Sequence, residues 1–264
     1  MILGFALMWT ALGATLLGLI LPRSWVADLL VHFRLQYALI AIAACLILAF
    51  TGHAGWAALS FVIAVFQALL CVPLITARVP AAPAGGAVPT LSFRAAAINV
   101  WYRNKKFSRV AQFAAEEQPD ILLLAEITDA WEQSLAGLTA QYPYKFSTRG
   151  TPRFTGLMLL SRWPMQATVL PDFSDAEPAI TATVSIAEHR IGVLAVHPSW
   201  PMTGACTRLR NEQLQMIGAY AARHTGALLV LGDLNISPFS PVLQSLISGE
   251  RLRSAAQGFG WQPT

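Results

Sequence analysis

The stretch Ala227-Leu228-Leu229-Val230-Leu231-Gly232-Asp233-Leu234-Asn235 decides the fold that we expect for this chain. Its first five residues are apolar without polar alternation, which predicts a strand buried on both faces of an α/β sheet. Asp233 and Asn235 follow at the carboxyl end of this strand, where open α/β sheets place their ligands. One residue separates them, so both side chains can face the same cleft. A carboxylate beside an amide suits hydrolysis of a phosphate ester, because the carboxylate can orient or deprotonate water and the amide can donate to developing charge.

Three other strand-like runs also end in a polar residue: Asn99 after Leu91–Ile98, Glu126 after Ile121–Ala125, and His197 after Ile191–Val196. Strand ends at one sheet edge converge even when they are far apart in sequence, so we expect these side chains to join Asp233 and Asn235. One glutamate with amide and carboxylate oxygens suits Mg²⁺ or Mn²⁺.

Each of these residues also has an ordinary interpretation. Glu126 could be a solvated acid that favours a helix dipole, and Asn99 could cap a turn. His197 could be a loop histidine, and Asp233 could form an Asx-turn. The joint pattern weighs more than any single residue, because every site follows an apolar run.

The polar half of the chain reads as one α/β domain. Early βαβ units followed by several consecutive strands predict two packed sheets with helices outside. The expected helices are 107–117, 128–138, 207–224 and 241–247, and the expected strands are 91–99, 121–125, 157–161, 166–170, 179–187, 191–196 and 227–231.

The first third of the chain predicts a membrane domain. The chain is 55% hydrophobic and only 12% charged, against about 25% charged in soluble domains. Before Arg78 the only charged side chains are Arg23, Asp28 and Arg34. Three apolar stretches, about 2–21, 35–52 and 56–75, predict three transmembrane helices within residues 1–78. A signal peptide is the alternative for the first stretch, but no basic residue precedes it.

Residues 79–90 are rich in Pro, Ala and Gly and predict a linker to a domain at 91–264. Three crossings would place the arginines at 23, 34, 78 and 94 on the side of that domain. The positive-inside rule then favours a cytoplasmic domain in a multi-pass protein of the cell membrane. The two sides of the membrane differ by only a few arginines, so an extracytoplasmic location of the domain remains an alternative.

The cysteine and charge content limits the kinds of site and partner that this chain can have. Cys45, Cys71 and Cys206 support neither a disulfide framework nor a cysteine-rich metal site. From Leu91 onward, 15 Lys or Arg face 13 Asp or Glu. Arg103, Lys105 and Lys106 are the only tight basic group, so a nucleic-acid partner stays open but is not favoured.

Five motifs follow one another along the chain: Ile98-Asn99-Val100, Leu122-Leu123-Leu124-Ala125-Glu126, Leu160-Ser161-Arg162-Trp163-Pro164, Val196-His197-Pro198 and Leu231-Gly232-Asp233-Leu234-Asn235. This order is the one seen in the endonuclease/exonuclease/phosphatase family. The chain resembles this DNase I-like family over 91–264. With its apolar first third, it resembles the membrane-anchored bacterial subgroup linked with glycopeptide resistance. The resemblance implies a four-layer α/β/β/α sandwich preceded by a bundle of three transmembrane helices, and a divalent metal, usually magnesium.

The resemblance also assigns roles. It implies that Glu126 is a metal ligand, that Asn99 helps hold metal or phosphate, and that His197 contacts the phosphate. Asp233 would orient or activate water and Asn235 would support the site. Arg162 and Arg210 become candidate phosphate contacts or supporting residues, although surface charge is the favoured interpretation of Arg210.

Two departures from the family pattern matter. Trp101 stands where many family nucleases carry an aspartate, and no histidine follows Asn235, where the family has a closing Asp-His pair. The last histidine is His224, in an expected helix. We therefore expect a domain that is incomplete at its carboxyl end.

The sequence predicts a membrane-anchored, divalent-metal-dependent phosphoesterase for a phosphate monoester or diester, with a lipid-linked substrate favoured by the membrane anchor. A nuclease is one alternative. A catalytically inactive, membrane-tethered binding protein is the other.

Overall fold

The computed structural model describes residues 1–21, 24–76, 91–148, 155–170, 173, 178–248 and 252–256. The expected linker at 79–90, Arg23, Arg78 and residues 257–264 lie outside these ranges. The chain divides into two compact units. One comprises Met1–Gly85, Pro201–Arg208 and Ile236–Thr264, and the other comprises Gly86–Trp200 and Leu209–Asn235.

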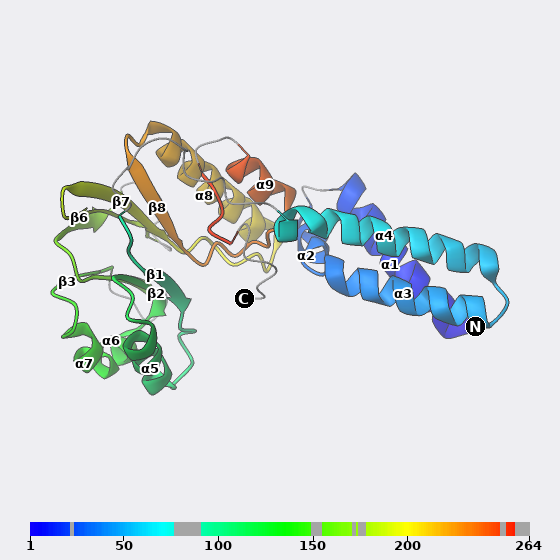
Figure 1. Ribbon diagram of the computed structural model, residues 1–264, viewed down its shortest axis with the longest axis horizontal. Helices are drawn as coiled ribbons and strands as arrows, with labels where there is room; N and C mark the ends of the chain where they lie inside the picture. Colours follow the sequence, from blue (N-terminus) through cyan, green and yellow to red (C-terminus); the bar gives the residue numbers. More distant parts are fainter. Residues whose placement is uncertain are drawn as a thin grey trace. The chain divides into compact units, whose positions relative to one another are not determined.

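Two four-stranded sheets form the second unit (Figure 1). The first has the order β1-β2-β4-β3 and the second the order β5-β6-β7-β8. β1 runs parallel to β2, and β7 runs parallel to β8, so each sheet has one edge where two neighbouring strands end together. The strands are β1 (Ala95–Asn99), β2 (Ile121–Ile127), β3 (Tyr144–Ser147), β4 (Gly156–Ser161), β5 (Met165–Val169), β6 (Ile180–Ile186), β7 (His189–Val196) and β8 (Ala227–Gly232).

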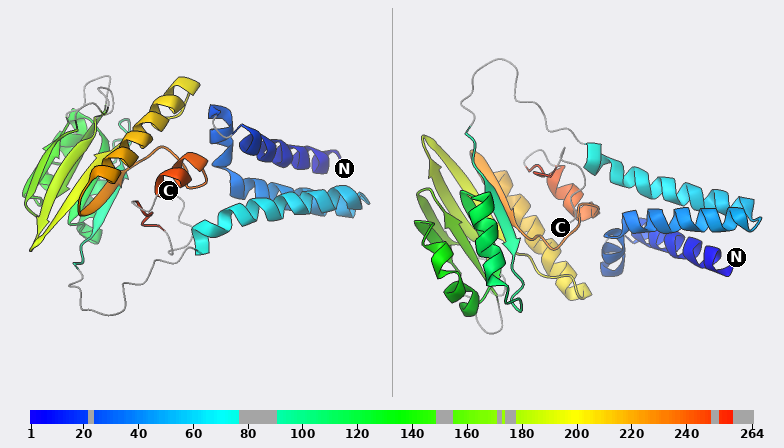
Figure 2. Two further views of the ribbon diagram at one scale, coloured as in Figure 1. Left: turned by 90° about the horizontal axis from the view of Figure 1, so that it is seen from above. Right: turned by 60° about the horizontal axis from the view of Figure 1, so that its bottom comes forward.

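The sheets pack face to face with helices outside, which confirms the four-layer sandwich (Figure 2). Leu123, Leu159 and Val193 are fully buried between the sheets. The outer face of the first sheet is covered by α5 (Phe107–Glu117), α6 (Asp129–Ser134) and α7 (Ala136–Thr139). The second sheet is covered by α8 (Gly204–Arg223), on which Tyr220 lies 2.6 Å from the Thr181 hydroxyl.

Most expected elements form, and the differences have physical reasons. β3 was not predicted, because Tyr144-Lys145-Phe146-Ser147 is too short and polar for a clear pattern. β8 is half-buried rather than buried on both faces, because it is an edge strand whose only strand partner in the described chain is β7. The helix expected over 241–247 is α9 (Pro241–Ile247), and Ser240 caps it by accepting from the Val242 N–H.

The apolar first third forms α1 (Ile2–Ile20), α3 (Arg34–Phe50) and α4 (Ala54–Thr76). α1 and residues 54–72 are long and apolar enough to span a membrane. The expected loop at 22–34 instead contains α2 (Trp25–Val31), because Ser24 caps its first turn at the Ala27 N–H. α2 and α3 meet at 70°, and only the two together are long and apolar enough to span a membrane. The described chain therefore holds two candidate membrane spans, or three if this bent pair counts as one span.

Small residues and one polar cluster pack these helices together. Ala11, Ala41 and Ala44 are fully buried, as is typical of close contacts between membrane helices. Arg34 donates to Gln67 Oε1 at 3.3 Å, and Gln67 donates to Thr15 Oγ1 at 2.8 Å. Arg34 is 8% exposed, so it lies inside the bundle and not in a flanking loop. Arg34 therefore no longer counts among the four loop arginines on which the cytoplasmic prediction was based.

Candidate active site

Glu126 is turned into the site by a bulge in β2. Ala125 pairs with Leu157 and Ile127 with Gly156, so Glu126 has no partner opposite it. Its φ is +63°, a left-handed conformation that costs a non-glycine residue of the order of 1 kcal/mol or more. The bulge breaks the strand's alternation and aims the carboxylate along the edge where β1 and β2 end. Its Oε2 accepts from the Tyr102 backbone N–H at 3.0 Å.

Asp233 and Asn235 are held by a tight turn after β8. The Asn235 N–H donates to Asp233 Oδ1 at 3.0 Å, and Asn235 has φ +49°. The turn begins at Gly232, where φ is +153° and a Cβ would overlap the carbonyl oxygen of Val196. The glycine is therefore required for the close approach of β8 to β7. Asp233 therefore forms the Asx-turn and also lies in the cluster through its Asn99 contact, so the two interpretations do not compete.

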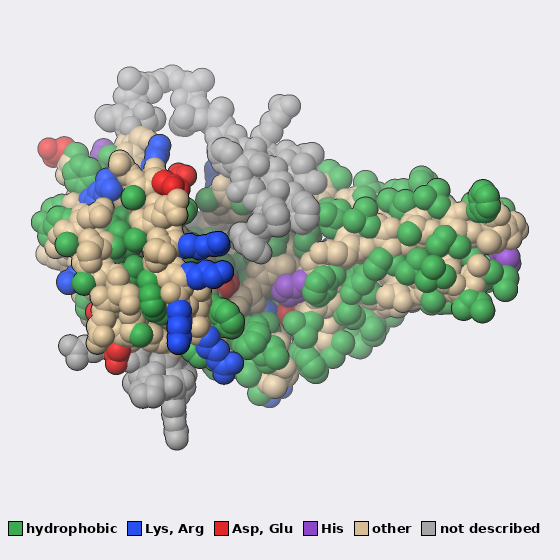
Figure 3. Space-filling view, turned by 90° about the horizontal axis from the view of Figure 1, so that it is seen from below, with side chains coloured by type: hydrophobic (Ala, Val, Ile, Leu, Met, Phe, Trp, Pro, Cys, Tyr) green, Lys and Arg blue, Asp and Glu red, His purple; other side chains and the backbone are tan. Residues whose placement is uncertain are grey.

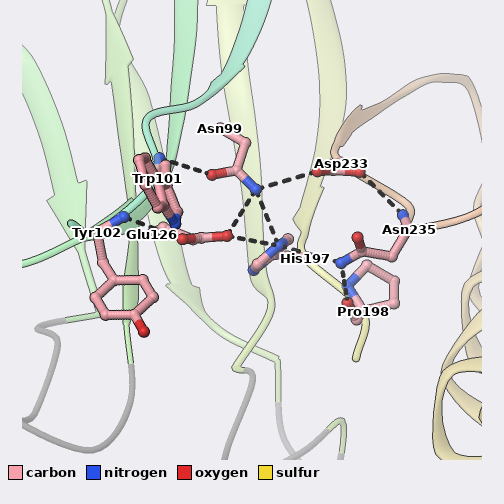
Figure 4. A network of polar contacts seen from close by, with 8 residues as sticks. All are labelled: Asn99, Trp101, Tyr102, Glu126, His197, Pro198, Asp233 and Asn235. Atoms are coloured by element: carbon pink, nitrogen blue, oxygen red, sulfur yellow. Dashed lines mark hydrogen bonds and ion pairs between the residues drawn. The ribbon is translucent and has the colours of Figure 1, made fainter. Parts of the chain in front are cut away.

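Asn99, at the end of β1, joins the two carboxylates (Figure 4). Its Nδ2 donates to Glu126 Oε1 at 2.8 Å and to Asp233 Oδ2 at 3.1 Å. Its Oδ1 accepts from the Trp101 N–H at 3.0 Å. This amide orientation gives both carboxylates an N–H donor, whereas the reverse would put a carbonyl oxygen against them.

His197 completes the cluster from the end of β7. Its Nε2 lies 3.8 Å from Glu126 Oε1, and it faces the amide nitrogens of Asn99 at 3.4 Å and Asn235 at 3.3 Å. The Glu126 and His197 side chains are 16% and 15% exposed, so both remain reachable from solvent. The structure thus brings together all five predicted residues from four strand ends.

Arg210 is a correction to the sequence analysis, which favoured surface charge for it. It is 0% exposed, and its Nη1 donates to the carbonyl oxygen of Asn235 at 3.1 Å. Its Nε and Nη2 donate to Asn211 Oδ1. The available signal was its spacing, since residues 210, 214, 217 and 221 lie on one helix face and are all buried.

Arg162 does not belong to the site. It follows Ser161, which pairs with Ile121 at the first residue of β2, whereas Glu126 lies at the other end of that strand. Its guanidinium lies over the Tyr142 ring, 5.7 Å from the centroid. The last histidine, His224, also lies elsewhere, stacked on Tyr220 against Gly192.

The electrostatics of the cluster suit a hard cation. The carboxylates of Glu126 and Asp233 both lie within 3.1 Å of one nitrogen, the Asn99 Nδ2, and they also contact backbone N–H groups and His197. The described residues hold no group of three or more His, Cys, Asp or Glu side chains placed to bind a metal. Mg²⁺ does not need such a group, because it binds through one or two carboxylates and completes its shell with water and substrate oxygens.

A two-sheet α/β/β/α sandwich with carboxylates, amides and a histidine at its strand ends defines a DNase I-like protein. Residues 96–264 match the Endonuclease/Exonuclease/phosphatase family, and the chain belongs to this family. The family name describes enzymes that cleave phosphate esters. A comparison with curated proteins gave no match.

Several solved structures are similar to this chain. One is humanized D. rerio TDP2 carrying 14 mutations, at 15% identity over 62% of this chain and 68% of that one, with a TM-score of 0.48. Sphingomyelinase C from Streptomyces griseocarneus matches at 18% identity over 60% and 70%, with a TM-score of 0.48. A β-hairpin deletion mutant of Staphylococcus aureus beta toxin matches at 14% over 60% and 72%, with a TM-score of 0.49. The family assignment rests on the match over residues 96–264 and not on these structures.

Proposed function

We propose that this chain is a membrane-anchored, divalent-metal-dependent phosphoesterase whose substrate is a phosphate monoester or diester carried by the bilayer. The observation that supports this best is the sharing of one Asn99 amide by the Glu126 and Asp233 carboxylates. Two carboxylates at one partly exposed strand edge make a negatively charged site that a divalent cation would neutralise. The apolar helices of the first third supply the anchor.

Glu126, with the Asn99 amide oxygen, would hold Mg²⁺ or Mn²⁺. When bound, the cation would polarise the phosphoryl group and stabilise its charge. Asp233 uses one acceptor position on each oxygen for Asn99 and Asn235, which leaves further lone pairs to accept a proton from the attacking water. His197 and the Asn235 amide would donate hydrogen bonds to phosphate oxygens. Hydrolysis would form the water oxygen–phosphorus bond and break the ester bond, and the proton that Asp233 accepts from the water would pass to the departing oxygen or to solvent.

The test is release of p-nitrophenolate by purified full-length protein with Mg²⁺, from a mono- and a bis-p-nitrophenyl phosphate. We expect Glu126→Ala and Asp233→Ala each to lower kcat by about a hundredfold or more. Glu188→Ala is the matched control, because Glu188 is an exposed carboxylate in the turn between β6 and β7. Equal rates in all four proteins would refute the mechanism.

A nuclease is the second candidate, and one observation favours it. Arg103, Lys105, Lys106 and Arg109 are all exposed and lie close together in sequence just after the Asn99 strand. Neutralising backbone phosphates makes binding strongly salt-dependent. Binding of single- or double-stranded DNA that falls steeply with salt would support this candidate, and no binding at low salt would exclude it.

A further inference from the structure

A hollow next to the candidate site lies over the aromatic edge of the core of the first sheet. It has a volume of about 560 Å³, within the range of small-molecule pockets. The loop after β1 and helix α6 enclose it. Tyr102 connects it to the site, because this residue lines the hollow while its backbone N–H donates to Glu126 Oε2.

The charge of the hollow is one-sided. Arg103 and Lys105 line it and are exposed, and none of the described residues that line it is acidic. The Arg103 guanidinium lies 5.2 Å from the centroid of the Tyr102 ring, which keeps this cation beside the hollow. Figure 3, seen from the side of α5, shows several Lys and Arg side chains gathered on this face of the domain.

The inner wall of the hollow is aromatic. Phe107 and Trp131 both line the hollow, and their rings meet edge to face at 4.6 Å. Trp131 is 1% exposed, yet its indole N–H has no hydrogen-bond partner among the described residues. That nitrogen has less than 1 Å² of exposed surface, so a ligand in the hollow would meet the aromatic rings and not this N–H.

We propose that this hollow binds a second phosphate group of the substrate, next to the phosphate that is cleaved. This inference rests on the proposed phosphoesterase function and specifies its substrate class: a compact head group that carries two phosphates. Two cations and no acid match the oxygens of a phosphate. A single hollow bounded by one loop and one short helix fits one head group better than a run of nucleotides.

A binding measurement tests the hollow without relying on catalysis. The probe is propyl phosphate, titrated calorimetrically into full-length protein in detergent with EDTA. We expect the double variant Arg103→Ala/Lys105→Ala to weaken binding by about tenfold or more. The matched control Lys106→Ala/Arg109→Ala removes the same charge from exposed neighbours that do not line the hollow, and it should leave the affinity unchanged. Equal weakening by both double variants would overturn the proposal.

A kinetic measurement then tests the substrate class. With Mg²⁺, we expect kcat/KM for propane-1,3-diol bisphosphate to exceed that for propyl phosphate, and Arg103→Ala/Lys105→Ala to remove this preference through KM. An unchanged preference would overturn the proposal. If neither compound is hydrolysed, the phosphoesterase function fails, while the calorimetry still decides whether the hollow binds phosphate. Tighter binding of a short single-stranded DNA than of the bisphosphate, lost in the same variant, would replace the head group with a nucleic acid.

Discussion

Arg210 is a buried side chain that contacts the turn at Asp233 and Asn235 through the backbone carbonyl of Asn235. It holds the carbonyl oxygen of Asn235, whose amide faces His197 and the Pro198 carbonyl. The planar fork of arginine reaches Asn211 and Asn235 at once, which a lysine cannot reproduce. We therefore expect Arg210 to act as a positioning residue for Asp233 and Asn235.

The Arg210→Lys variant should lower kcat by about tenfold to a hundredfold while changing KM little, because the turn shifts but the rest of the site stays in place. Steady-state kinetics of the full-length protein would measure this split. Arg208→Lys, on an exposed position of the same helix, is the control. A loss that fell on KM instead would argue against a positioning role.

Gly232 carries a steric constraint that can be separated from backbone strain. Gly232→Ala would bring its Cβ onto the Val196 carbonyl oxygen, so we expect it to lower the free energy of unfolding by about 2 kcal/mol or more. Gly226→Ala is the matched control, because Gly226 also has a positive φ, of +96°, but has no atom within 4 Å of the added Cβ. Denaturant unfolding of both variants would give the two costs, and equal costs would remove the steric explanation.

At the scale of elements, strand ends could be predicted from the sequence and local distortions could not. The apolar runs before Asn99, Glu126, His197 and Asp233 were each long enough to define a strand, so the convergence of the site followed from topology. The bulge at Glu126 could not be predicted, because Ile121–Ile127 is apolar on both faces and shows no change of phase. The burial of Arg210 was missed because a single charged residue on an apolar helix face was read as solvated.

Tyr142 ties two connections together on the side of the sandwich away from the site. It lies between α7 and β3, is buried, and donates to the carbonyl oxygen of Pro119, which lies between α5 and β2. Burial raises the pKa of Tyr142 above its ordinary value, and the nearby Arg162 opposes this in part. The group therefore stabilises the fold fully below its unfolded pKa of about 10, and this contribution is lost as the pH rises through the folded value.

The Tyr142→Phe variant should be less stable than the wild type near pH 8, by about 1 kcal/mol for the lost hydrogen bond. Above about pH 10 the difference should shrink or reverse, because only the wild type must keep an acidic phenol neutral when folded. Urea unfolding across this range would measure both effects. Tyr144→Phe, at an exposed strand position, should show no such crossing, and a parallel pH dependence of all three proteins would contradict the assignment.

At the scale of the whole molecule, the bundle fixes the direction of each helix. Near one end, Gly4 of α1 faces Ile47 and Leu48 of α3, and Phe5 packs on Trp56 of α4. Near the other end, Thr15, Arg34 and Gln67 form the hydrogen-bonded cluster. α1 and α4 therefore run in one direction and α3 runs back between the same two ends.

This arrangement favours three crossings over a re-entrant α3. With 17 residues, α3 is about 25 Å long, close to the hydrocarbon thickness of about 30 Å. An odd number of crossings would place the start of α1 and the α/β domain on opposite sides of the membrane.

This topology can be tested with two reporters: an epitope tag placed before Met1, and the Cys206 thiol in a variant whose Cys45 and Cys71 are replaced by alanine. We expect the tag and the thiol to differ in accessibility in intact cells. An impermeant maleimide and external protease should reach one of the two sites, and permeabilised cells should expose both. If intact cells exposed both sites or protected both, the two would share a side, and α2 with α3 would be a re-entrant loop.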